Sequence, residues 1–131
     1  MNRRGFLWAV GAAGLWLLLP ASAAAEPIKE KQTREKIRTA IRGRRILRFR
    51  YQGLSREFEP HALGTVKGGR VALLGWQISG QSRSGPPPGW RTFVLSEISN
   101  LRLFKKTFVP RTTYRAERAN LREIEIDVNS P

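Results

Sequence analysis

The chain has 131 residues, which is room for a single domain. Its 24 Lys and Arg residues against 10 Asp and Glu residues give a formal net charge of +14, and it contains no Cys and a single His. This composition argues against disulfide frameworks, zinc fingers, iron–sulfur clusters and catalysis by Cys or by a Ser–His pair, and it leaves a small basic domain that must be stabilised by packing.

Residues 1–25 have the three parts of a secretory signal peptide. Two arginines near the start are followed by an apolar run that extends to Leu19, and an Ala-rich stretch follows Pro20. The run is shorter than the roughly 20 residues that cross a bilayer as a helix, so cleavage after Ala25 is expected, with an uncleaved membrane anchor as the alternative. The arginine pair also fits a twin-arginine signal, so either the Sec or the twin-arginine route would lead to a periplasmic or otherwise exported protein.

Residues 26–43 are expected to form one helix. Pro27 suits a first helical turn, and Gly43 suits the end of the helix. The apolar residues at helical spacing fall in the second half, which should therefore dock on the rest of the domain: Ile37, Ala40 and Ile41.

Residues 44–108 alternate short apolar segments with Gly-containing turns. The pattern predicts strands at residues 45–51, 55–60, 71–78, 90–95 and 101–108. Pro60 should end its strand or lie at an edge, because proline has no N–H to donate. The strand over 71–78 is apolar at successive positions, so we expect it to be covered on both sides, by the sheet interior and by the helix. Such a series predicts a mainly β fold, a small SH3-like or OB-like barrel preceded by one α-helix.

Three further segments have more than one interpretation. The loop over residues 80–89 ends in three prolines and is expected to be stiff and exposed, with a recognition segment as the alternative. The tail over 109–131 contains strand-like alternation near its end, whereas residues 114–122 could be helical. Basic residues crowd the helix end and one strand face, as either a polyanion-binding patch or a solvated face: Arg42, Arg44, Arg45, Arg48 and Arg50.

Several segments follow one another in the order and spacing of a known bacterial family: Tyr51–Gly53, Arg56, Glu59–Gly64, Lys67–Trp76 and Arg91–Ile98. Over about residues 36–108 the chain resembles the WYL domain. The resemblance implies an SH3-like or Sm-like barrel and a ligand-sensing role in regulators, with nucleotides or nucleic acids as suspected ligands. The chain departs from the family where the Trp-Tyr-Leu triplet is replaced by Val71–Leu73 and the Asp-Arg-Ile triplet by Ser96–Ile98. Only one helix fits before the first strand, so a direct transcription-factor role is not expected.

Matching the family pattern residue by residue points to a ligand-binding cluster of Tyr51, Arg56, His61 and Arg91. Guanidinium groups beside aromatic rings suit a phosphate, a carboxylate or a base. The alternative for both arginines is an ion pair with one of three glutamates, Glu57, Glu59 or Glu97. In that case His61 would cap a turn and Tyr51 would belong to the core.

Together these features predict an exported, non-catalytic, regulatory ligand-binding module of WYL type. The expected ligand is an anion such as a nucleotide or a nucleic acid. The alternative is a structural or protein-interaction domain at the cell envelope, with an envelope protein or an anionic membrane surface as its partner. No metal, cofactor or enzymatic activity is expected, because one His and few clustered acids offer neither a metal site nor an acid–base pair, and Gly80–Gly85 lacks the spacing of a nucleophile elbow.

Overall fold

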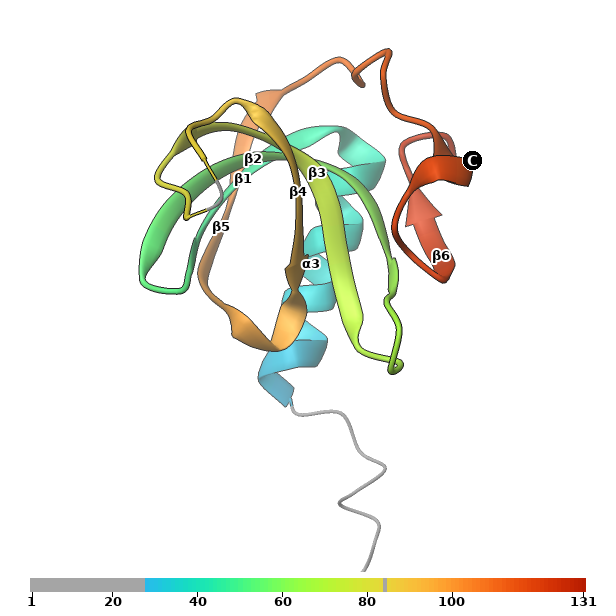
Figure 1. Cartoon of the computed structure of the whole chain (residues 1–131), viewed down its shortest axis with the longest axis horizontal. Coiled ribbons are helices and arrows are strands. Elements are labelled where there is room, and N and C mark those ends of the chain that lie inside the picture. The colour runs from blue at the N-terminus through green and yellow to red at the C-terminus, as the bar shows by residue number, and fades with distance from the viewer. Residues whose placement is uncertain (1–27, 84) are drawn as a thin grey trace, which may run out of the picture.

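The computed structural model describes residues 28–83 and 85–131 (Figure 1). One helix and six strands are joined by two short 3₁₀ turns: α3 (Ile28–Gly43), β1 (Arg45–Tyr51), β2 (Leu54–Thr65), β3 (Val71–Gly80), β4 (Gly89–Val94), η3 (Leu95–Glu97), β5 (Ile98–Thr107), η4 (Ala116–Arg118) and β6 (Glu123–Asp127). Within this part of the chain no helix has the length and apolarity needed to span a membrane. The predicted signal peptide lies outside the described residues.

The strands form one antiparallel sheet in the order β4-β3-β2-β1-β5, and β6 pairs with β2. The sheet is strongly curved (Figure 1). The mainly β fold with one preceding helix is therefore confirmed. Strands β4 and β5 stand at the two ends of the hydrogen-bonded order. Closure into an SH3-like or Sm-like barrel consequently remains a prediction.

Strand β2 continues through Pro60, where the sequence pattern predicted a strand end. Its first half pairs with β1 up to Phe58, and its second half pairs with β6 from Ala62 onward. Pro60 lies between the residues that pair with β1 and those that pair with β6. This edge of β2 has no paired strand at Pro60, so the absence of a proline N–H breaks no hydrogen bond there. A register shift in the β2–β3 ladder falls at the same place. The proline is thus at a local edge, and the strand bends past it.

The core lies between α3 and the concave sheet. The predicted apolar stripe of α3 is buried, and α3 packs against β1, β2, β5 and β6. Three phenylalanines meet edge to face, with ring centroids 5.2 to 5.6 Å apart: Phe49, Phe58 and Phe93. The helix was expected to cover β3, but the C-terminal segment contributes there instead, since the Arg111 guanidinium lies 5.0 Å from the Trp76 ring centroid.

The C-terminal segment after β5 returns to the sheet and ends as β6. Tyr114, Ile126 and Val128 are buried in the core, and the Val128 N–H donates to the His61 carbonyl at 2.9 Å. The sequence left open whether residues 114–122 form a helix. The structure has one 3₁₀ turn there, η4.

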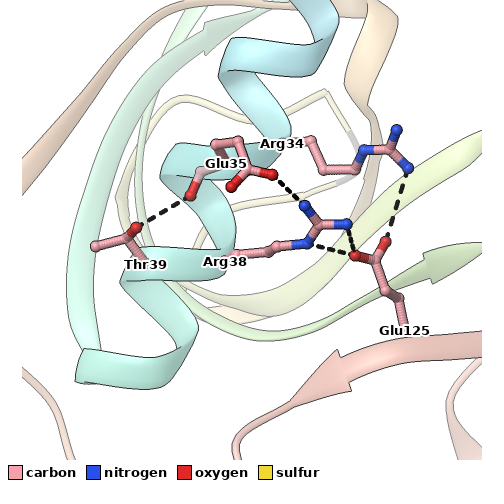
Figure 2. Close-up of polar contacts among 5 residues, drawn as sticks. All are labelled: Arg34, Glu35, Arg38, Thr39 and Glu125. Carbon is pink, nitrogen blue, oxygen red and sulfur yellow. Dashed lines mark hydrogen bonds and ion pairs between the residues drawn. The ribbon is translucent and has the colours of Figure 1, made fainter. Parts of the chain in front are cut away.

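Charged residues fasten β6 to α3 (Figure 2). Arg38 pairs with Glu125 of β6 and with Glu35 of its own helix. Arg34 approaches Glu125 as well, with an N···O distance of 3.8 Å. These contacts make the C-terminal segment an integral part of the fold.

Candidate functional site

The guanidinium of Arg56 is buried at one end of the sheet. Its side chain is 2% exposed, and its Cζ lies 5.1 Å from the Phe93 ring centroid and 5.7 Å from that of Tyr51. Nη1 donates to Gln77 Oε1 and Nη2 donates to the Tyr51 carbonyl, both at 3.3 Å. The buried Nε has no partner among the described residues. A buried cation is thus held by two long bonds to neutral acceptors and by aromatic faces.

The neighbouring glutamates do not neutralise Arg56. Glu57 accepts from Arg48 at 2.8 Å, and Glu59 accepts from both Nε and Nη2 of Arg111. Burial lowers the pKa of Arg56, and the positive charges of Arg91 and Arg83 lower it further. The alternative in which Glu57 or Glu59 pairs with Arg56 is therefore not what the structure shows. Positive charge accumulates at this end of the sheet.

Gln77 is fully buried beside Arg56, although the sequence pattern did not single it out. Its Nε2 donates to the carbonyls of Ser79 at 3.1 Å and Gln81 at 3.0 Å. These two bonds fix the orientation of the amide so that Oε1 faces the guanidinium. A polar amide within the apolar run over 71–78 is the signal that would have indicated this role.

Tight backbone packing brings this end of β3 against β2. Arg56 is opposite Gly80 in the ladder, and Gly80 has φ of +99°. A Cβ at Gly80 would lie 2.3 Å from the Ser55 carbonyl oxygen, so only glycine fits.

Arg91 on β4 lies near Arg56 and is partly exposed. Its Nε donates to Ser82 Oγ at 3.2 Å, Nη1 to the Trp90 carbonyl at 2.9 Å and Nη2 to the Gly85 carbonyl at 3.1 Å. These acceptors are neutral, as are those of Arg56. The two arginines therefore form a cationic pair, and none of the acceptors named above is a carboxylate.

Tyr51 joins the same cluster as a positioning residue. Its ring centroid lies 4.5 Å from that of Phe93, and its hydroxyl accepts from the Val94 N–H at 3.3 Å. Its carbonyl accepts from Arg56. Tyr51 thus connects β1, β2 and β4 at the cationic end of the sheet.

His61 lies in a different cluster. Its side chain is fully buried, Nδ1 is 2.8 Å from the Glu59 carbonyl, and Nε2 accepts from the Arg111 N–H at 3.0 Å. Because an amide N–H only donates, the proton of the neutral imidazole resides on Nδ1. Burial lowers the pKa of His61, which favours this neutral form. Both ring nitrogens serve the backbone, so the candidate site comprises Tyr51, Arg56, Gln77 and Arg91 without His61.

The ring neighbours of His61 belong to the C-terminal segment and β4. Its centroid lies 4.9 Å from Trp90, 5.2 Å from Phe108 and 5.6 Å from Tyr114. This second aromatic cluster joins the segment after β5 to the sheet. The described residues contain no group of three His, Asp or Glu side chains placed to hold a metal ion.

Comparisons with known proteins agree with this architecture. No curated protein matches the chain. Among solved structures, proteasome accessory factor B/C (PafBC) of Arthrobacter aurescens is similar, with 26% sequence identity and a TM-score of 0.53 over 66% of this chain. The similarity covers 14% of the PafBC chain, so this protein spans a small part of that one. The WYL domain family model matches residues 32–103, which is more than half of the sequence. The chain therefore belongs to the WYL domain family.

Proposed function

We propose that this protein is a regulatory, non-catalytic ligand-binding domain that takes an anionic ligand at the Arg56–Arg91 end of its sheet. Membership of the WYL family and the similarity to PafBC support a regulatory binding role. The observation that carries the proposal is the buried guanidinium of Arg56, which no described carboxylate neutralises.

An unpaired buried charge costs several kcal/mol, and proteins normally pair such charges. Arg56 lacks this compensation, and the charge of Arg91 increases the local positive potential. An anion that binds Arg91 at the surface would supply the missing negative charge to both residues. A phosphate or carboxylate fits best, because its oxygens match the planar donors of a guanidinium.

A nucleotide or nucleic acid is the ligand class that combines such oxygens with a planar ring. Tyr51 is half-buried and its ring centroid lies 5.7 Å from the Arg56 Cζ, so it supplies an aromatic edge at this position. Export forms part of the proposal as well, and its support is the signal-like sequence of residues 1–25.

Calorimetric titration of the full chain with ATP, and separately with a short thymidine oligonucleotide, tests this function. We expect Arg91→Ala to weaken binding about tenfold or more, because hydrogen bonds to charged groups contribute about 1.5 to 3 kcal/mol. Native affinity should also fall between about 50 mM and about 200 mM salt. The two ligands distinguish a nucleotide from a nucleic-acid site.

Arg70→Ala is the matched control. It removes the same charge from an exposed turn directly before β3. Arg56 pairs with the last residue of that strand, roughly 30 Å along the strand at the usual rise per residue. Equal losses of affinity in Arg91→Ala and Arg70→Ala would show non-specific attraction by net charge and would contradict the assigned site. Arg91→Lys separates charge from geometry, since it retains the charge without the planar donors.

A further inference from the structure

A cavity of about 550 Å³ lies on the side of the sheet where β4 meets the C-terminal segment. Residues of β3 and β4 form one wall, and residues of the returning segment form the other: Leu74, Trp90, Arg91, Thr92, Thr113, Tyr114, Arg115, Arg118, Ala119 and Asn120. Figure 1 shows this segment leaving β5 and passing over the upper end of the sheet before it reaches β6. The second wall follows residue 103, where the match to the WYL family ends. The cavity therefore lies between the part of the chain that matches the WYL family and the C-terminal segment that follows it.

Specific contacts fix both walls in place. Tyr114 is 7% exposed, and its hydroxyl donates to Asp127 Oδ2 at 2.9 Å. Burial and this bond raise the pKa of Tyr114 far above its usual value, so the phenol stays protonated. On the opposite rim the Thr92 hydroxyl donates to Asn120 Oδ1 at 2.9 Å. Hydrogen bonds thus tie the returning segment to β6 and to β4 around the cavity.

Aromatic and cationic groups together determine the chemistry of this cavity. The Trp90 and Tyr114 rings, with centroids 6.1 Å apart, supply apolar surface. Arg115 and Arg118 are exposed at the cavity, and none of the lining residues that the structure describes is acidic. Arg115 donates from Nη1 to the carbonyls of Thr112 and Tyr114, which orients its guanidinium. Glu117 of η4 is absent from the lining.

We propose that this cavity is a second binding site, which takes a small aromatic anion. The planar ring packs against Trp90 and Tyr114, and the phosphate or carboxylate binds Arg115 and Arg118. The volume lies in the range of about 300 to 1,000 Å³ that is usual for small-molecule pockets. Arg91 also lines this cavity, so the second site adjoins the one under Proposed function, but Arg56 and Gln77 take no part in it.

Titration of the full chain by NMR with 4-nitrophenyl phosphate and, separately, with 4-nitrobenzoate tests the site and distinguishes the two anionic groups. We expect shifts of the Trp90 indole and of the amides of residues 113–120. The double variant Arg115→Ala/Arg118→Ala should weaken binding at least tenfold, whereas Arg56→Met should leave it unchanged. The latter result separates this site from the Arg56–Arg91 site.

Arg102→Ala/Lys105→Ala is the control pair, since it removes two exposed charges from β5. It should bind as the native chain does. The proposal is contradicted if the Arg115→Ala/Arg118→Ala variant binds both probes as tightly as the native chain. It is also contradicted if uncharged 4-nitrobenzyl alcohol binds as well as the anions, or if neither anion binds the native chain at millimolar concentration.

Discussion

The buried charge of Arg56 lowers the stability of the folded chain, but the proposed function requires that charge. Its neutral hydrogen-bond partners compensate the buried charge only in part. Replacing a buried ionic group by an apolar side chain of similar size is often neutral or stabilising. Arg56 is therefore the position where a gain in stability and a loss of binding should coincide.

Arg56→Met is expected to leave the free energy of unfolding unchanged or to raise it. At most buried positions, by contrast, truncating the side chain lowers the free energy of unfolding by about 2 to 5 kcal/mol. Urea denaturation measures this. The variant leaves Gln77 Oε1 without its donor, so Arg56→Met/Gln77→Leu should be at least as stable as the single variant. A loss of more than about 2 kcal/mol in both variants would show that Arg56 is a structural group.

His61 should make stability depend on pH. Burial lowers its folded-state pKa below the unfolded value of about 6.5, so the folded state binds fewer protons than the unfolded one in this range. The stability contribution is complete above about pH 6.5 and is lost as the pH falls through the folded-state pKa. We expect the urea midpoint to fall between about pH 7 and about pH 5, where carboxylates with pKa values near 4 contribute little.

His61→Gln is the matched variant for this effect. Its amide keeps a donor and an acceptor for the Glu59 carbonyl and the Arg111 N–H, and it does not titrate. The variant should show a flatter urea midpoint over the same range. An equal slope in both proteins would assign the pH dependence to other groups.

At the scale of elements, the position of β6 against β2 depends on Gly64. A Cβ at Gly64 would lie 1.9 Å from the Glu123 carbonyl oxygen, which is backbone and has little freedom to move. Gly64→Ala is expected to cost about 1 to 3 kcal/mol of unfolding free energy, as is typical of overpacking. Thermal and urea denaturation measure this cost.

Gly43→Ala is the control for this substitution. A Cβ there would meet only the flexible Arg45 side chain, at 3.3 Å. It should change stability by less than about 0.5 kcal/mol. Equal stability of Gly64→Ala and the native chain would mean that β6 is not held against β2 in solution.

Local periodicity was sufficient to predict α3 and five of the strands, because their apolar residues repeat at helical or alternating spacing. Local periodicity could not predict that β6 pairs with β2 or that β2 continues beyond Pro60, because both features depend on which strands become neighbours. The site was predictable in the same measure. Tyr51, Arg56 and Arg91 lie together as predicted. His61 instead accepts a hydrogen bond from the N–H of Arg111, which is 50 residues away in the sequence, and no local pattern reveals that contact.

For the whole molecule, the net charge of +14 draws anions of every kind. The arginines of the helix end and the basic strand face are exposed or half-exposed, so water solvates their charge, unlike that of the buried Arg56. Arg44 donates to the Val128 carbonyl, Arg45 to the Phe104 carbonyl and Arg50 to the Gly53 carbonyl. The basic strand face thus contributes mainly a diffuse attraction, whereas Arg56 and Arg91 are the candidates for a specific one.

Ligand-induced stabilisation distinguishes these two contributions. A ligand that binds only the folded state raises the melting temperature with its concentration. We predict that saturating ATP raises the melting temperature of the native chain at about 0.15 M ionic strength, where diffuse surface attraction is screened. The melting temperature of Arg56→Met should rise less with ATP than that of the native chain, although this variant is expected to be at least as stable without ligand. An equal rise in both proteins would contradict an anion site built on the buried guanidinium.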